Sequence, residues 1–329
     1  MNETVGNVLH QVGALPSLDR MLLLVAVLPA TFMLLEFSFP ARPRQPVPRR
    51  SLAVNLAYWF FNPLFMQVAS KLAVCLVCLG LCLVLGWEVS ESVLDGFGPL
   101  GAQPLWLQAV EMVVFADFVD YWTHRWFHVT RFWRFHAIHH SPEQMNWLAS
   151  ARMHPVNDFV TRVCQVVPVI LAGFSLKAVF LVVPFLVFFV IVLHSNLNWD
   201  YGPLRWVFVS PLYHRWHHTT DQEGLDKNFA GIFPIWDVLF GTAHFPRREP
   251  TKFGVNHDPP PETFLGQLLY PFRALPEPIP PSPFSVREGE PAVPPAPPSS
   301  EGEAVTDESQ PSLGGAASSG HTPPSSFPG

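Results

Sequence analysis

The sequence has few charged residues for its length. Charged side chains make up only 14% of the 329 residues, whereas hydrophobic residues make up 49%. Soluble domains usually carry about 25% charged residues, so this composition favours a membrane protein. The formal net charge of −6 is small, and nothing in the sequence points to nucleic acid as a partner.

Cysteine is also scarce, which excludes a disulfide framework. Cys75, Cys78, Cys82 and Cys164 all lie in apolar runs, where cysteine is usually a small packing residue. The Cys75-x2-Cys78 spacing occurs in zinc and redox motifs, but a second pair is absent. The G-x-G-x-x-G pattern of dinucleotide-binding folds and the H-E-x-x-H pattern of zinc proteases are absent too.

Histidine, in contrast, is concentrated. Eight of the fourteen histidines fall in three short blocks, one of the form His-x3-His and two of the form His-x2-His-His. Positions i, i+3 and i+4 of a helix share a face, so we expect each block to direct its imidazoles to one point. Neutral imidazole is a common ligand of iron, zinc and copper. The blocks are His124 and His128; His136, His139 and His140; and His214, His217 and His218.

A lone His-x3-His pair is more often a pair of surface residues than a metal site. Three blocks, two with the same spacing, are too regular for that interpretation. Eight imidazoles also exceed the four ligands of a typical zinc site. We therefore predict two metal ions that share one cavity.

These blocks resemble those of the fatty acid hydroxylase and sterol desaturase superfamily of membrane-bound di-iron oxygenases. The resemblance covers roughly residues 117–242 and includes short motifs outside the blocks. The resemblance implies that the metal is iron. The imidazoles by themselves do not identify the metal, since they also suit zinc and copper. The motifs are Asp120-Tyr-Trp-x-His-Arg, His139-His140-Ser141, Arg152-x-His-Pro155, His194, Asn228-Phe229 and Trp236-Asp-x-Leu-Phe-Gly-Thr242.

Six further residues are candidates around the metals. His194 is predicted to be a ninth ligand, in a region where the family also carries histidine. Asp117 and Asp120 are candidates to accept hydrogen bonds from outer nitrogens of ligand histidines, with an interfacial carboxylate as the alternative for each, and Asp237 is a candidate to lie next to the ligands. His154 is expected beside the metals or the substrate, or else in a structural role. Asn198, four residues after His194, is expected to hold a water, ligate weakly or act as a structural amide.

Five apolar segments predict an all-α integral membrane helical bundle. A spanning helix needs about 20 residues, and the first three segments are long enough. The second segment allows either one long tilted helix or a tight hairpin. The last two are marginal in length and are expected to form a hairpin that enters the membrane and returns. The segments are residues 20–39, 51–86, 104–128, 156–173 and 176–193.

Charge asymmetry predicts the orientation of the bundle. Residues 40–50 carry four arginines, which marks them as cytoplasmic by the positive-inside rule. Residues 87–103 carry three acidic and no basic residues, which favours the opposite side. The crossings then bring the histidines together in a cytoplasmic helical cap that holds a dinuclear metal site. Asp117 and Asp120, at the end of the third segment, are functional candidates because ionisable residues are costly at membrane depth.

Three regions are expected. Residues 1–103 form N-terminal membrane helices and loops, and residues 104–275 form a membrane-embedded catalytic domain. Residues 276–329 are rich in Pro, Ser and Gly and are predicted to be a disordered tail. Arg125 and Arg215 recur inside two histidine blocks and are expected to pair with Asp120, Asp237 or lipid phosphates.

The resemblance implies an oxygenase with two Fe ions that uses O2 to hydroxylate or desaturate a lipid C–H bond. No flavin, haem or nicotinamide motif is present, so electrons must come from a separate donor, such as a cytochrome b5- or ferredoxin-type reductase chain. Sterol, fatty acyl chain, ether lipid and carotenoid all remain open as substrates. A bacterial inner membrane is favoured over the endoplasmic reticulum, since no C-terminal retrieval signal is present.

Two alternatives remain open at this point. One is a lipid-aldehyde lyase or metal hydrolase that uses the same histidines, since such a site can also bind zinc. The other is a non-enzymatic membrane metal-binding or transport protein. Transport favours ionisable residues spread across the bilayer, whereas these histidines are expected to cluster on one side.

Overall fold

The computed structural model describes residues 18–43, 45, 48–85 and 95–274. Regular secondary structure in this part of the chain is helical, apart from two isolated β-bridges, Pro40 to Leu197 and Thr219 to Phe253. The predicted all-α class is therefore confirmed for these residues. The predicted tail at residues 276–329 lies outside them, and so do the side chains of Cys75, Cys78 and Cys82.

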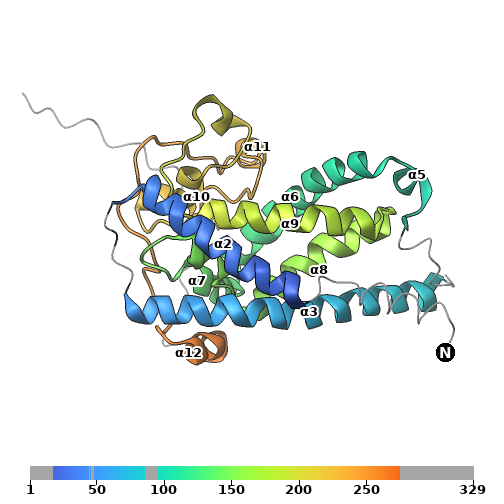
Figure 1. Cartoon of the computed structure of the whole chain (residues 1–329), viewed down its shortest axis with the longest axis horizontal. Coiled ribbons are helices and arrows are strands. Elements are labelled where there is room, and N and C mark those ends of the chain that lie inside the picture. The colour runs from blue at the N-terminus through green and yellow to red at the C-terminus, as the bar shows by residue number, and fades with distance from the viewer. Residues whose placement is uncertain (1–17, 44, 46–47, 86–94, 275–329) are drawn as a thin grey trace, which may run out of the picture. The chain divides into compact units, whose positions relative to one another are not determined.

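Five long helices match the five predicted apolar segments (Figure 1). The second is one continuous helix of 37 residues, so the hairpin alternative is wrong. It contains Pro63; membrane-spanning helices tolerate an internal proline where neighbouring groups satisfy the backbone carbonyl that the proline leaves free. At about 1.5 Å per residue it is about 55 Å long, well beyond a hydrocarbon core of about 30 Å. The helices are α2 (Leu18–Ser38), α3 (Arg49–Leu85), α6 (Leu105–Val129), α8 (Pro155–Ala172) and α9 (Leu176–His194).

Local signals explain the turn between α8 and α9. Gly173 ends α8 with φ of 98°, a left-handed conformation that favours glycine. Two residues after Gly173, the Ser175 hydroxyl accepts the Ala178 N–H and caps the start of α9. Among the described residues, α8 and α9 are the two helices long and apolar enough to cross a membrane.

Helix α6 packs against both α8 and α9, and this places its C-terminal half beside the end of α9 (Figure 1). Apolar side chains from all three helices and the α8–α9 turn form the contact. Its buried members are Met112, Val169, Phe174, Ala178 and Val182.

Most of the short helices gather near the C-terminal ends of α6 and α9 (Figure 1). The one just before α6, at residues 98–101, lies instead beside the α8–α9 turn, where the Phe97 N–H donates to Gly173 O. One cluster of buried residues joins Tyr121 of α6 and Leu193 of α9 to Tyr213 and Phe229. The short elements are α5 (Gly98–Gly101), α7 (Trp133–His140), η1 (Trp147–Ala151), η2 (Gly202–Trp206), α10 (Pro211–His217), η3 (Gln222–Gly224), α11 (Ile235–Leu239), α12 (Phe264–Leu269) and η4 (Tyr270–Phe272).

Candidate metal centre

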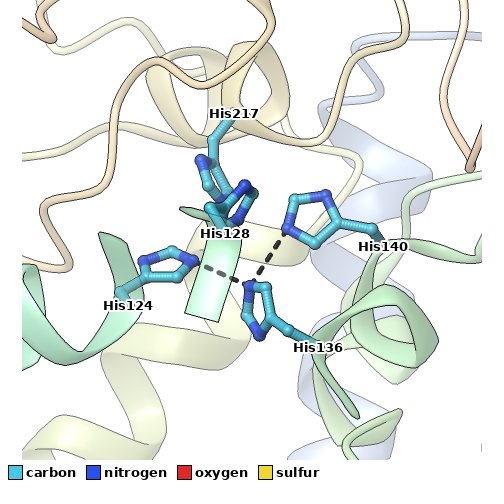
Figure 2. Close-up of side chains that lie close together, drawn as sticks. All are labelled: His124, His128, His136, His140 and His217. Carbon is cyan, nitrogen blue, oxygen red and sulfur yellow. Dashed lines mark hydrogen bonds between the residues drawn. The ribbon is translucent and has the colours of Figure 1, made fainter. Parts of the chain in front are cut away.

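Nine histidines from α6, α7, α9 and α10 lie together in two groups. Within each group, the nitrogens that can bind a metal lie within 4.8 Å of one another. These nine are the residues predicted as ligands from the sequence. The first group, drawn in Figure 2, is His124, His128, His136, His140 and His217, and the second is His139, His194, His214 and His218.

The blocks do not each converge on one point, which corrects the expectation from spacing. His136 and His140 of α7 join the first group, whereas His139 between them joins the second. Likewise His214 and His218 join the second group, and His217 joins the first. Residues four apart differ by only about 40° around a helix axis, whereas residues three apart differ by about 60° in the other sense. The i, i+4 pair therefore stays together, and the remaining histidine reaches the other group.

The two groups are in direct contact. The rings of His140 and His218 stack with centroids 4.3 Å apart, and those of His139 and His218 are 4.7 Å apart. The two groups also meet on α7, where the ring centroids of His136 in the first group and His139 in the second are 5.2 Å apart. The arrangement is thus one block of imidazoles with two centres.

Six of the nine rings contact an oxygen atom through Nδ1, the nitrogen that faces away from the group's centre. Where the oxygen is a carbonyl, it can only accept, so Nδ1 carries the hydrogen and Nε2 keeps its lone pair. The contacts are His124 to Phe229 O (2.8 Å), His217 to Lys227 O (2.8 Å), His136 to Asn157 Oδ1 (2.8 Å), His139 to Arg152 O (3.1 Å), His194 to Val190 O (2.8 Å) and His128 to Asp226 Oδ1 (3.2 Å).

The inner nitrogens are too close together for lone pairs with nothing between them. Nε2 of His124 and Nε2 of His136 are 2.9 Å apart, although neither carries a hydrogen (Figure 2). Nε2 of His139 and Nε2 of His194 face each other in the same way at 3.0 Å. Two nitrogens bound at about 2.1 Å and at a right angle to one metal ion would be about 3.0 Å apart. Both groups therefore fit a metal ion.

Burial favours the neutral form of the six histidines in and beside α7 and α10. The pKa of each histidine from α7 and of His214, His217 and His218 lies well below the ordinary value of 6.5. Desolvation of the charged ring is the main cause, and repulsion by neighbouring histidines adds to it. Because the neutral ring binds metal, these side chains need not lose a proton to do so at neutral pH.

Asp237 supports the rings indirectly, through the backbone of Phe229. Its buried carboxylate accepts the N–H groups of Phe229 (2.8 Å) and Ala230 (2.9 Å). It also accepts the hydroxyls of Tyr213 (2.9 Å) and Thr242 (2.6 Å). Phe229 in turn supplies the carbonyl that orients His124, so Asp237 holds the backbone that holds the ring.

The carboxylates of α6 do not take the contacts expected of them. Asp120 accepts a hydrogen bond from Gln165 Nε2 at 3.1 Å, and the outer nitrogen of His124 donates to a backbone carbonyl instead. Asp117 is buried and accepts the N–H groups of Ile232 (2.7 Å) and Phe233 (2.9 Å). It therefore fixes the segment that follows Phe229.

His154 and Asn198 lie apart from the nine histidines. His154 caps α8, because its Nδ1 accepts the Val156 N–H at 3.1 Å and its Nε2 contacts Leu268 O at 3.2 Å. Asn198 is exposed. Helix α9 ends at His194, and the next residue is extended, so the expected i, i+4 relation to Asn198 does not exist.

The residues that orient the rings were missed from the sequence. Four are backbone carbonyls, which have no side-chain signature. Asn157 and Asp226 do have one: Asn157 follows the Arg-x-His-Pro motif, and Asp226 lies two residues before Asn228-Phe229.

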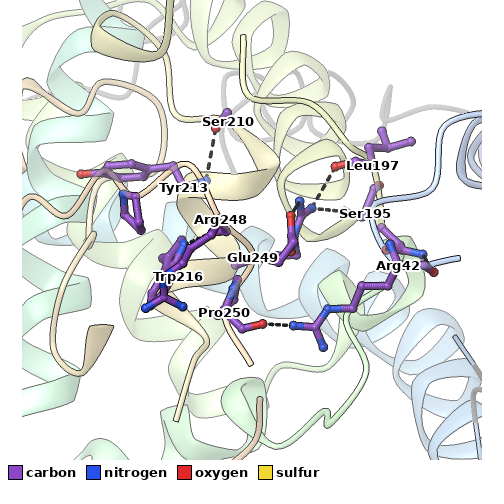
Figure 3. A network of polar contacts seen from close by, with 12 residues as sticks. Arg42, Ser195, Leu197, Ser210, Tyr213, Trp216, Arg248, Glu249 and Pro250 are labelled. Atoms are coloured by element: carbon purple, nitrogen blue, oxygen red, sulfur yellow. Dashed lines mark hydrogen bonds and ion pairs between the residues drawn. The ribbon is translucent and has the colours of Figure 1, made fainter. Parts of the chain in front are cut away.

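Arg215 pairs with Glu249, so the expected pairing with Asp120, Asp237 or lipid phosphate is wrong. Figure 3 shows Glu249 in a polar network that also contains Ser195 and Leu197. The guanidinium is 1% exposed and forms two bonds to the Glu249 carboxylate, of 2.6 Å and 2.8 Å. It also donates to Ser195 O and Leu197 O. Arg215 thus ties α10 to the chain that follows His194.

Known proteins resemble the part of the chain that holds these histidines. The family model described as fatty acid hydroxylase matches residues 109–242. Ornithine lipid hydroxylase OlsE of Rhizobium tropici is 32% identical over 171 residues, which cover 51% of each chain. Alkylglycerol monooxygenase of Caenorhabditis elegans is 34% identical over 164 residues, 49% of this chain and 31% of that one.

Methylsterol monooxygenase 1-3 of Arabidopsis thaliana is 26% identical over 138 residues, 41% of this chain and 47% of that one. The chain thus spans about half, or less, of the length of the curated relatives it matches. No solved structure matches it.

Proposed function

Because the chain belongs to the fatty acid hydroxylase and sterol desaturase superfamily, we propose that it is a membrane-bound di-iron oxygenase that hydroxylates a membrane lipid. The observation that carries the proposal is the pair of adjacent histidine groups, whose facing Nε2 atoms are 2.9–3.2 Å apart. The relatives named above are a hydroxylase and two monooxygenases, which favours hydroxylation over desaturation.

One iron ion would be held by the five histidines of the first group and one by the four of the second. When bound, the iron pair, reduced by electrons from an outside donor, would activate O2 for attack on an unactivated C–H bond. The protein holds six of the nine rings in place through their outer nitrogens. The Phe229 ring covers one side of the first group, with centroids 5.0 Å from His128, 5.6 Å from His217 and 5.7 Å from His124. An apolar cover of this kind excludes water from the ligands.

The reaction also needs electrons from outside the chain. We propose a separate donor of the cytochrome b5 or ferredoxin-reductase type, since the sequence carries no flavin, haem or nicotinamide motif. The relatives named above act, by their names, on ornithine lipid, alkylglycerol and methylsterol, so the proposed substrate is a membrane lipid.

The exposed faces of two short helices support a site at the membrane surface. In α11, Trp236 packs inward on Phe118 of α6, whereas Ile235, Val238 and Leu239 are 45–63% exposed. In α12, Phe264 packs on Tyr58 of α3, whereas Leu265 and Leu269 are 65% and 52% exposed. Short helices with apolar outer faces suit the boundary between headgroups and acyl chains.

We accordingly propose a multi-pass protein with its histidines on the cytoplasmic side of a bacterial inner membrane. The arginines of residues 40–50 support this orientation. A lipid could then bring a carbon near its headgroup to the metals without leaving the bilayer.

The test combines metal analysis with isotope labelling. The full chain, purified in mild detergent after growth with ample iron, is expected to hold about two irons. Membranes with a reductase and 18O2 are then expected to yield a lipid that has gained one 18O atom, and His139→Ala membranes none. A lipid that loses two hydrogens instead would indicate desaturation. Fewer than two metals per chain, or turnover without O2, would refute the proposal.

A further inference from the structure

One short segment orients three of the five rings in the first group. We call residues 226–229 the orienting loop. Asp226 contributes a carboxylate oxygen, and the residues on either side of Asn228 contribute backbone carbonyls. The contacts are His128 Nδ1 to Asp226 Oδ1 (3.2 Å), His217 Nδ1 to Lys227 O (2.8 Å) and His124 Nδ1 to Phe229 O (2.8 Å).

The fold itself holds this loop in shape. Asp226 and Asn228 have φ of 52° and 61°, in the left-handed region that Asn and Asp tolerate better than most residues. Asn228 is fully buried, and its side-chain amide donates to Tyr213 O (3.0 Å) and His244 O (2.9 Å). Its backbone N–H donates to Thr242 O at 3.0 Å. The acceptors of the orienting loop are therefore in place before a metal binds.

In the second group two of the four rings have an outer contact, compared with four of the five rings in the first group. His139 and His194 donate to backbone carbonyls, of Arg152 and Val190. The Nδ1 atoms of His214 and His218 are buried without a hydrogen-bond partner. Among the residues that the structure describes, no carboxylate other than that of Asp226 forms an ion pair with the nine histidines. The two groups thus differ in their number of histidines and in the hydrogen-bond partners of the outer ring nitrogens.

We propose that Asp226 is a positioning residue that makes the two metal positions unequal, so that the first group binds its ion more tightly than the second. This inference rests on the dinuclear site of the proposed function. A carboxylate behind a ligand histidine fixes the ring and increases electron donation to the metal, and losing such a partner typically costs about 10–100-fold in metal affinity. The second group offers no such partner to any of its four rings.

The experiment measures two dissociation constants for Fe2+ under anaerobic conditions. The full-length protein in detergent is titrated against a coloured ferrous chelator, first as wild type and then as Asp226→Asn. We expect one tight and one weaker ion in the wild type. In D226N we expect the tight constant to weaken by about 10–100-fold while the weaker constant stays the same. Asparagine has the same shape and accepts the left-handed backbone, so the variant is expected to fold.

Two further variants control the result. Asp221→Asn makes the same change five residues earlier, where the carboxylate binds the Thr251 N–H and hydroxyl and contacts no histidine. It is expected to leave both constants unchanged. Asp226→Glu restores the charge and is expected to recover part of the tight binding.

The outcomes separate this inference from the function on which it rests. Two equal constants in the wild type would overturn the inference, and this decides the matter even where D226N does not fold. Two ions in D226N with unshifted or equally shifted constants would overturn it as well. Fewer than two ions in the wild type would overturn the dinuclear proposal itself.

Discussion

Asp237 offers the sharpest test of how the protein holds its ligands. Replacing it by alanine leaves four donors without their acceptor, two of them hydroxyls that can turn to other partners. The N–H groups of Phe229 and Ala230 cannot turn. A buried unsatisfied donor costs about 1–3 kcal/mol, so Asp237→Ala is expected to lose about 2–6 kcal/mol. That is a large part of a typical domain stability of about 5–15 kcal/mol.

Asp237→Asn should cost less, for a reason that the geometry supplies. Each carboxylate oxygen accepts one of the two N–H groups, Oδ1 from Phe229 and Oδ2 from Ala230. The amide keeps one oxygen and turns an NH2 toward the other N–H, so about 1–3 kcal/mol is lost. The loosened Phe229 carbonyl should also release His124, so iron should be lost from the first group.

The assay is thermal unfolding of the detergent-purified protein together with iron content per chain. Asp158→Asn is the matched control, because Asp158 forms a partly exposed i, i+4 ion pair with Arg162 that is worth about 0.5 kcal/mol. We expect D158N to be the most stable of the three variants, D237N to be less stable, and D237A to be the least stable. A D237A protein as stable and as iron-rich as D158N would refute the role given to this carboxylate.

Three more predictions follow from the same geometry. His139→Ala and His217→Ala remove ligands from different groups, so each should lose about one iron by metal analysis; loss of both ions in both variants would contradict separate groups. Arg215→Met leaves the Glu249 carboxylate without its partner and should lower the unfolding temperature, by an amount that corresponds to less than the about 3–5 kcal/mol of a fully buried pair because Glu249 is 29% exposed. The histidines of α7 and α10 have pKa values below 6.5 in the folded protein, so the unfolded chain binds more protons in acid and the metal-free protein should lose stability as pH falls below 6.5. An unfolding temperature that stays constant from pH 7 to pH 5 would contradict this.

Much of the site can be predicted from the sequence because the information is local. Segment length and hydropathy predicted the five long helices, and all nine predicted ligand histidines lie in the two groups. Both kinds of inference need only the residues within one helix. The same reasoning failed for Asn198, since it assumed that α9 continues past His194.

Contacts between helices decided the rest. Helical spacing fixes the angle between two side chains of one helix, but not which neighbouring helix each one meets, and so His139 and His217 join different groups from the other histidines of their blocks. Arg215 was expected to find Asp120 or Asp237, yet the chain brings Glu249 to it from 34 residues away. The partners of the outer ring nitrogens are mostly backbone carbonyls, which every residue possesses. Composition and spacing thus predicted which histidines could bind metal, whereas only the packing of the helices decided how these histidines are divided into two groups and what orients them.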